Sequence, residues 1–247
     1  MVNEVGVSEV TQQLQKYRFR EDLNHSFEVA SLLEAEFLQD FIENLTMIIN
    51  APSAKVTASI FIKRYAFVAV MSLYAMTVWN KKLNVSIGGL TMEKPEQGKA
   101  WLPSFSIKNV SESEEDWNGH DRSEWRETVL QGLFAENISL LIEKIEKTFK
   151  ISKLILWENI AVYLFWLYET ELKDEVTPNI AEDFHFLIFE AEGRLFGPYK
   201  INRLQKYYRE KKQTEVSDEA IRIRKTCCFN YTLGGASKNC KTCPCRK

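Results

Sequence analysis

The residues of this sequence best suited to chemistry are its five cysteines, which all lie within the last 21 positions. Two are adjacent, eleven other residues follow, and then come a Cys-x-x-Cys unit, one proline and a final cysteine. They are Cys227, Cys228, Cys240, Cys243 and Cys245. Thiols that form structural disulfides are spread along a chain, whereas metal ligands converge on one point. The pattern predicts a site for Zn²⁺ or for an iron–sulfur cluster.

The two halves of this pattern place different demands on a metal. Cys240-x-x-Cys243 is the usual local unit, because a tight turn lets both sulfurs face one metal. Cys227-Cys228 is unusual, since the side chains of adjacent residues diverge in extended backbone. Both can ligate if the backbone turns there or if they bind different metals. A cluster with two irons is favoured, because the two adjacent sulfurs can then bind different metals. A structural zinc knuckle and metal-free thiols remain alternatives.

Charge is distributed unevenly along the chain. From residue 199 to the end there are 13 Lys/Arg against 4 Asp/Glu, a net charge of +9, while the rest carries −11. Cations near a metal–thiolate centre stabilise its reduced form and attract an anionic ligand. The candidate substrate-binding residues are the basic residues nearest the cysteines in sequence: Arg222, Arg224, Lys225, Lys238 and Lys241.

The cysteine segment resembles the C-terminal signature of the bacterial ferric siderophore reductases of the FhuF-like type. The resemblance lies in residues 221–231 and in Cys240-Lys241-Thr242-Cys243-Pro244. The signature is a Cys-Cys pair after a basic residue, a tyrosine three residues past the pair, and Cys-x-x-Cys near the chain end. In this sequence the spacing between the pairs is one residue longer than is typical, and Cys245 is extra. The resemblance implies one [2Fe–2S] cluster with the ligands Cys227, Cys228, Cys240 and Cys243.

The resemblance also implies an activity, the one-electron reduction of Fe(III) in an imported siderophore of hydroxamate or citrate type, with release of Fe(II). Such oxygen chelators hold Fe(III) far more tightly than Fe(II), so one electron makes the complex labile. The sequence shows no dinucleotide-binding motif and no P-loop in a strand–turn–helix context. An external electron donor is therefore implied, such as a ferredoxin or a flavoprotein reductase.

The alternative function is a zinc-stabilised binding module whose basic C-terminal face contacts nucleic acid. The acidic remainder of the chain argues against nucleic acid as a partner, because it would repel the phosphate backbone. We therefore favour the reductase.

The rest of the chain must position the cysteines, and its hydrophobic pattern predicts an α+β fold with a mostly helical body and one small antiparallel sheet. Alternating apolar residues predict a hairpin near 83–110, and a further strand is expected within 199–209. We expect two parts, a helical body over residues 1–198 and a basic segment over 199–247 that carries the cluster. Apolar periodicity and capping residues predict helices over 26–50, 54–79, 121–149, 152–172 and 177–193.

No membrane-spanning segment is expected. The longest stretch without a charged residue, 65–80, has 16 residues, whereas a span needs about 20. A buried core helix fits it better. Residues 1–20 lack the apolar core of a secretory signal. Together with clustered rather than spread cysteines, this predicts a cytoplasmic location.

Overall fold

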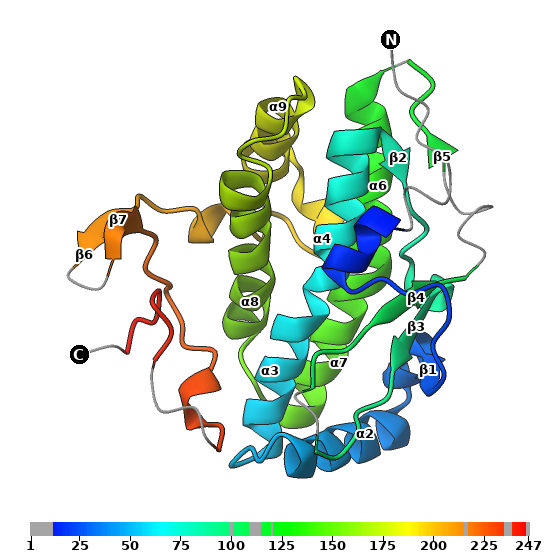
Figure 1. Cartoon of the computed structure of the whole chain (residues 1–247), viewed down its shortest axis with the longest axis vertical. Helices are drawn as coiled ribbons and strands as arrows, with labels where there is room; N and C mark the ends of the chain where they lie inside the picture. The colour runs from blue at the N-terminus through cyan, green and yellow to red at the C-terminus, as the bar shows by residue number, and fades with distance from the viewer. Residues whose placement is uncertain are drawn as a thin grey trace.

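The computed structural model describes residues 12–98, 101–108, 115–119, 121–214, 217–234 and 239–245. They form an α+β fold in which helices make up most of the body (Figure 1). The longer helices are α2 Ala35–Ile48, α3 Ala54–Tyr65, α4 Phe67–Tyr74, α6 Arg122–Leu133, α7 Ser139–Phe149, α8 Lys153–Trp166 and α9 Asn179–His185. The strands are β1 Ser26–Glu28, β2 Lys81–Lys82, β3 Leu90–Glu93, β4 Phe105–Ile107, β5 Glu115–Asp116, β6 Lys212–Thr214 and β7 Ser217–Ile221.

The centre of the body is one continuous helical stretch, Ala54–Trp79, which contains α3 and α4. By length and composition it could cross a membrane, but 83% of its most apolar window is buried inside the protein. It packs against α8, and α3 also contacts α2 and α7. Ser53 caps it by accepting the backbone N–H of Val56. This burial fits the predicted core helix.

The helices predicted over 121–149, 152–172 and 177–193 are present with small shifts at their ends. A turn of π-helix, Phe134–Ile138, joins α6 to α7, so one long helix runs from residue 122 to 149 as predicted. Asp121 caps it by accepting the backbone N–H of Ser123 at 2.8 Å. Ser152 caps α8, which continues into a second π-helical turn, Leu167–Glu171.

The small antiparallel sheet has the order β1–β3–β4. The hairpin predicted near 83–110 exists, and its strands are residues 90–93 and 105–107, while the alternating residues 83–87 form no strand. The reason is a turn before it, because the Asn84 side chain accepts hydrogen bonds from the backbone and hydroxyl of Ser86. This local bonding outweighs the alternating pattern and sends Ile87–Gly89 into a 3₁₀ turn.

Two further predictions of secondary structure are wrong. The helix expected from Ser26 begins only at Ala35, because residues 26–28 pair with β3 and Val29–Leu33 form a 3₁₀ turn. The strand expected within 199–209 is a 3₁₀ turn at Gln205–Tyr207, and the strands β6 and β7 follow it. Val29 and Leu32 in the first place and Leu204 and Tyr207 in the second are buried in the core, whereas Ile201 is exposed.

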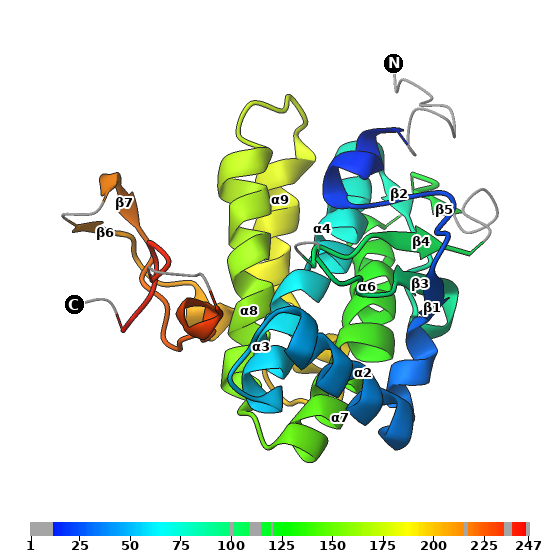
Figure 2. The same cartoon turned by 60° about the horizontal axis from the view of Figure 1, so that its bottom comes forward.

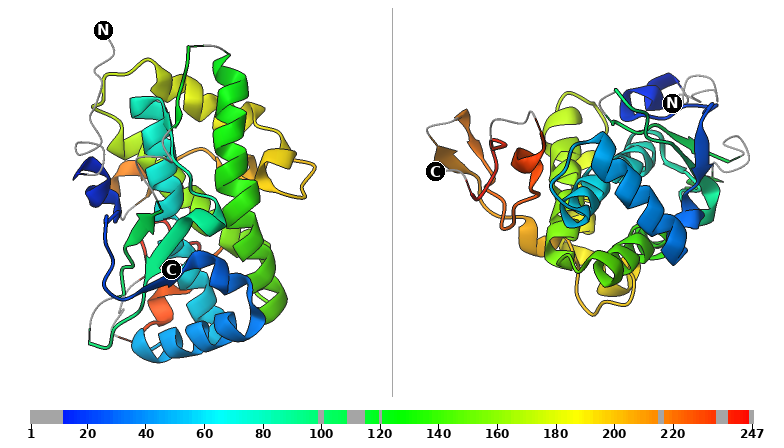
Figure 3. Two further views of the ribbon diagram at one scale, coloured as in Figure 1. Left: turned by 90° about the vertical axis from the view of Figure 1, so that its right-hand side faces the viewer. Right: turned by 90° about the horizontal axis from the view of Figure 1, so that it is seen from below.

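The described residues from 199 onward run along the side of α8 that faces away from the β1–β3–β4 sheet (Figure 2). Figure 3 confirms this arrangement from below, and both figures show the β6–β7 hairpin projecting from the helices. We call the described part of residues 199–245 the C-terminal segment.

Candidate metal centre

All five cysteines of the C-terminal segment are free thiols. The sulfur atoms of Cys227, Cys243 and Cys245 lie within 4.8 Å of one another, and those of Cys227 and Cys243 are 3.8 Å apart. The thiols of Cys228 and Cys240 share a hydrogen bond. Each member of the adjacent pair therefore has its own partner in the Cys-x-x-Cys unit. Cys227 and Cys228 therefore interact with different members of the second half of the motif.

The electrostatic environment differs between these thiols. The hydrogen bond from Cys240 lowers the pKa of Cys228 to about 4, with help from Lys63 and Arg224. The ammonium nitrogen of Lys63 lies 3.6 Å from the sulfur of Cys228. Burial raises the pKa of Cys227 to about 12, and the hydrogen bond to Cys228 raises that of Cys240. The nearby ammonium group of Lys63 favours the thiolate form of Cys228.

A buried carboxylate on α8 fixes the backbone that leads into the cysteine pair. Glu158, which is 2% exposed, accepts the backbone N–H groups of Lys225 at 2.6 Å and Thr226 at 2.7 Å. It also accepts the hydroxyl of Thr226. The guanidinium of Arg224 donates to the side chain of Asn159 at 2.5 Å and lies 3.9 Å from Glu158. The two buried charges therefore lie close to each other, although the Nε of Arg224 has no hydrogen-bond partner among the described residues.

The same network reaches the core helix α3. The amide of Asn159 donates to the carbonyl and hydroxyl oxygens of Ser59, and the Ser59 hydroxyl donates to the carbonyl of Cys228 at 3.0 Å. Lys63 follows Ser59 by one helical turn, which places both residues on the face of α3 next to the cysteines. Two central helices thus hold the first half of the site.

Backbone turns hold the loops that carry the remaining sulfurs. Phe229 has a left-handed backbone with φ 63°, and its N–H lies 3.3 Å from the sulfur of Cys227. The N–H of Cys243 donates to the carbonyl of Cys240 at 3.0 Å and closes the Cys-x-x-Cys turn. The N–H of Arg224 donates to the carbonyl of Thr242 at 3.0 Å, which ties the two halves of the motif together.

The predicted substrate-binding residues separate into two groups. Arg224 is buried, and Arg222 forms a two-pronged ion pair with Glu169 at 2.8 and 2.9 Å, so both are held by the protein itself. Lys225 and Lys241 are exposed beside the cysteines. Lys238 lies outside the described residues.

Sequence reasoning missed Lys63, Ser59, Glu158 and Asn159, which lie 65 or more positions before the cysteines they support. A signal did exist for two of them. Lys63 and Glu158 are charged residues within strongly apolar helices, and such residues are buried only when they have partners.

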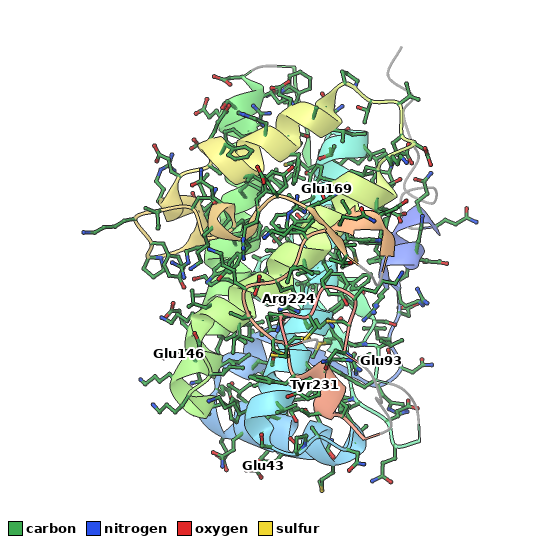
Figure 4. The ribbon with its side chains drawn as sticks, turned by 90° about the vertical axis from the view of Figure 1, so that its left-hand side faces the viewer. Glu43, Glu93, Glu146, Glu169, Arg224 and Tyr231 are labelled. Atoms are coloured by element: carbon green, nitrogen blue, oxygen red, sulfur yellow. The ribbon has the colours of Figure 1, made fainter. Side chains whose placement is uncertain are left out.

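Two adjoining cavities lie between α8 and the C-terminal segment. One has a volume of about 320 Å³ and extends to Glu169 and Arg222, and the other has about 290 Å³ and reaches Cys240. They share four lining residues, Val162, Trp166, Arg224 and Thr242. Figure 4 shows Arg224 between Glu169 and Tyr231, with side-chain sulfur atoms gathered between Arg224 and Tyr231.

A family model described as "Ferric iron reductase FhuF-like transporter" matches residues 85–213. The matched region runs from the sheet through α9 to β6 and ends before the first cysteine. It is therefore independent of the cysteine pattern that suggested the same family. A comparison with curated proteins gives no match.

Proposed function

Since the chain belongs to the family of FhuF-like ferric iron reductases, we propose that it reduces Fe(III) in a ferric siderophore by one electron, using a [2Fe–2S] cluster. The proposed ligands are Cys227, Cys228, Cys240 and Cys243. Cys245 is exposed and is not needed to complete the set.

The observation that carries this proposal is the pairing of the thiols. The sulfur of Cys227 lies 3.8 Å from that of Cys243, and the Cys240 thiol is close enough to Cys228 to lower its pKa, so sulfurs from opposite halves of the motif face each other, with Cys245 also within 4.8 Å of Cys227 and Cys243. Four cysteine thiolates are the usual protein ligands of a [2Fe–2S] cluster, and each iron takes two of them. A single tetrahedral zinc ion would instead require the side chains of Cys227 and Cys228 to turn toward one point.

The surroundings of the thiols fit a centre that gains negative charge on reduction. Lys63 faces the sulfur of Cys228, and the N–H of Phe229 faces that of Cys227. Positive charge and N–H groups near cysteine sulfur favour the reduced state. Glu158 and Asn159 fix the supporting loop, so the ligands are held in place before any metal binds.

When bound, a [2Fe–2S] cluster accepts one electron from an external donor and passes one electron to Fe(III). The protein's own residues hold the ligands, balance their charge and provide a cavity next to Cys240 that part of a chelate can enter. Iron leaves as Fe(II) because hard oxygen chelators bind it weakly. We propose a ferredoxin or a flavoprotein reductase of the cytoplasm as the donor.

The test of this proposal begins with the colour and metal content of the purified protein. We expect visible absorption and two irons with two inorganic sulfides per chain. A colourless protein with zinc and no sulfide would favour the zinc-stabilised binding module instead. The activity is then measured as Fe(II) captured by a ferrous chelator, with a chemical reductant, a ferric siderophore and catalytic amounts of protein. Cys240→Ser should abolish Fe(II) release.

A further inference from the structure

Three basic side chains of the C-terminal segment, Arg203, Lys206 and Lys225, lie together beside the first half of the thiol motif, and we call them the basic patch. Lys206 is half-buried, and burial together with the charges of Arg203 and Lys225 lowers the pKa of its ammonium group. Lys225 is exposed and stands two positions before Cys227. The basic patch therefore borders the metal centre.

The carboxylates nearest to the basic patch are engaged with other groups. Glu143 lies near Arg203, but it accepts hydrogen bonds from Lys153 and from the hydroxyl of Tyr199. Glu158 is held by the backbone N–H groups of residues 225 and 226. Among the described residues, no member of the basic patch forms an ion pair of its own. Like charges held side by side repel one another, and an anionic partner relieves that repulsion.

Contacts with α8 hold the basic patch in place. The hydroxyl of Tyr207 donates to the carbonyl of Leu154 at 2.9 Å, which fixes the turn that contains Lys206. The guanidinium of Arg203 lies 4.3 Å from the ring centroid of Tyr199. The side chain of Leu154 is itself exposed. Apolar surface beside basic side chains is a usual composition for a surface that binds another protein.

The basic patch is separate from the cavity of about 290 Å³ next to the metal centre. That cavity reaches Cys240, and no member of the basic patch lines it. Lys225 instead leads into Cys227 on the other half of the thiol motif. The metal centre therefore has two approaches, one for a small molecule at Cys240 and one across the basic patch.

We propose that the basic patch is the docking surface for the electron donor, and that the donor is a small acidic protein of the ferredoxin type. Its reduced iron–sulfur centre loses one electron and the centre held by the cysteines gains it, with no bond made and no proton moved. The part of the chain before residue 199 carries a net charge of −11 and repels an acidic protein, so docking is confined to the basic face. This proposal rests on the proposed function and names its electron donor.

Binding is measured by calorimetry, with an oxidised acidic [2Fe–2S] ferredoxin as the probe and the cluster-loaded protein as its partner. The double variant Arg203→Gln/Lys206→Gln should raise the Kd by about three- to tenfold at low ionic strength, because two surface charges are lost. The difference should disappear near 1 M salt, where the Debye length is about 3 Å.

A matched control removes the same charge from the opposite side of the molecule. Lys94→Gln/Lys108→Gln changes two exposed residues that follow β3 and β4, and α8 lies between that sheet and the C-terminal segment (Figure 2). This pair should leave the Kd unchanged. Lys206→Gln alone remains a valid test if the double variant does not fold, and the visible spectrum of each variant shows that its centre is loaded.

Rates separate donor docking from substrate binding. With reduced ferredoxin as the donor, the double variant should raise the KM for ferredoxin in the release of Fe(II). After chemical reduction, the same variant should be reoxidised by ferric citrate at a rate within about twofold of the unchanged protein. Slower reoxidation with normal ferredoxin binding would assign these charges to the substrate and overturn the proposal.

The docking surface and the reductase function fail in different ways. Ferredoxin binding that neither the double variant nor Lys206→Gln weakens, or that the control pair weakens equally, overturns the docking surface. The same holds if the double variant impairs only a flavoprotein donor or only the binding of duplex DNA. If ferredoxin binds as predicted but ferric chelates are never reduced, the docking surface stands and the reductase function fails. If chelates are reduced and both variants behave as the unchanged protein, the function stands and the docking surface fails.

Discussion

The cysteines differ in burial, and this difference suggests their roles. Cys228 and Cys243 are buried, Cys227 and Cys240 are partly buried, and Cys245 is exposed although its sulfur lies near those of Cys227 and Cys243. Buried thiolates need a positive partner, which a metal centre supplies. An exposed thiol has no such need. We therefore expect Cys245 to be dispensable for cluster binding.

Serine substitution at each cysteine tests this assignment. Cys227→Ser, Cys228→Ser, Cys240→Ser and Cys243→Ser should each abolish or strongly destabilise the cluster, because a hydroxyl is a poor ligand for iron in a sulfur site. Cys245→Ser should leave the visible spectrum nearly intact. The measurement is absorbance per iron after purification without oxygen. Loss of the spectrum in Cys245→Ser but not in Cys243→Ser would replace Cys243 by Cys245 in the ligand set.

Glu158 is the residue outside the motif on which the site depends most, because one carboxylate accepts two backbone N–H groups and a hydroxyl. Glu158→Gln removes the charge and turns an NH₂ group toward these donors. We expect the free energy of unfolding to fall by about 1–3 kcal/mol and the cluster to be lost faster. Urea unfolding and the decay of visible absorbance measure the two effects.

A matched control for Glu158→Gln is Glu36→Gln, at an exposed residue of α2. It should change the free energy of unfolding by less than about 0.5 kcal/mol. Equal effects of the two substitutions would show that the buried carboxylate does not hold the loop.

At the scale of elements, the helices were more predictable than the strands. The helix over 121–149 follows from its cap and its apolar stripe, and both act locally. The strand over 90–93 could not be placed in the same way, because its partners lie at 26–28 and 105–107 and the turn at Asn84 and Ser86 displaces it. The false helix start at Ser26 has the same origin, since pairing with a distant strand outweighed local periodicity.

In the candidate site, too, local features could be predicted from the sequence and contacts between distant residues could not. The cysteine pattern is local, so a metal site at these residues could be proposed from the sequence alone. Lys63 and Glu158 belong to α3 and α8, and nothing in the sequence near the cysteines identifies them as neighbours. Only the packing of these helices against the C-terminal segment places them at the site.

The connection from α9 to the C-terminal segment depends on close backbone contact at Gly193. A Cβ atom there would lie 2.4–2.5 Å from backbone atoms of Tyr199, Lys200 and Ile201. Gly193→Ala should therefore lower the free energy of unfolding by about 1–3 kcal/mol. Thermal or urea unfolding measures this change in the free energy of unfolding.

Gly132 in α6 provides the opposite case, because nothing lies within 4 Å of a Cβ added there. Gly132→Ala should raise the free energy of unfolding by up to about 1 kcal/mol, since alanine favours a helix more than glycine does. If Gly193→Ala is as well tolerated as Gly132→Ala, the close contact between the connection and residues 199–201 is not required for stability.

At the scale of the whole molecule, the body and the C-terminal segment contribute different parts of the function. The family match lies in residues 85–213, whereas the thiols lie in 227–245. The body supplies the helices α3 and α8 that hold the thiols, and it supplies most of the wall of the cavity next to Cys240. The C-terminal segment supplies the ligands and most of the basic charge near them. Among the described residues, neither part alone holds both the thiols and the side chains that support them.

The central claim is that one electron passes from the reduced protein to Fe(III) in a chelate. The most direct test is a single turnover without oxygen, in which chemically reduced protein is mixed with excess ferric siderophore and a ferrous chelator. We predict that the oxidised visible spectrum returns while one Fe(II) per cluster is captured. The claim is contradicted if the reduced spectrum persists with every ferric chelate, weak ones included, while a simple inorganic oxidant such as ferricyanide restores the oxidised form.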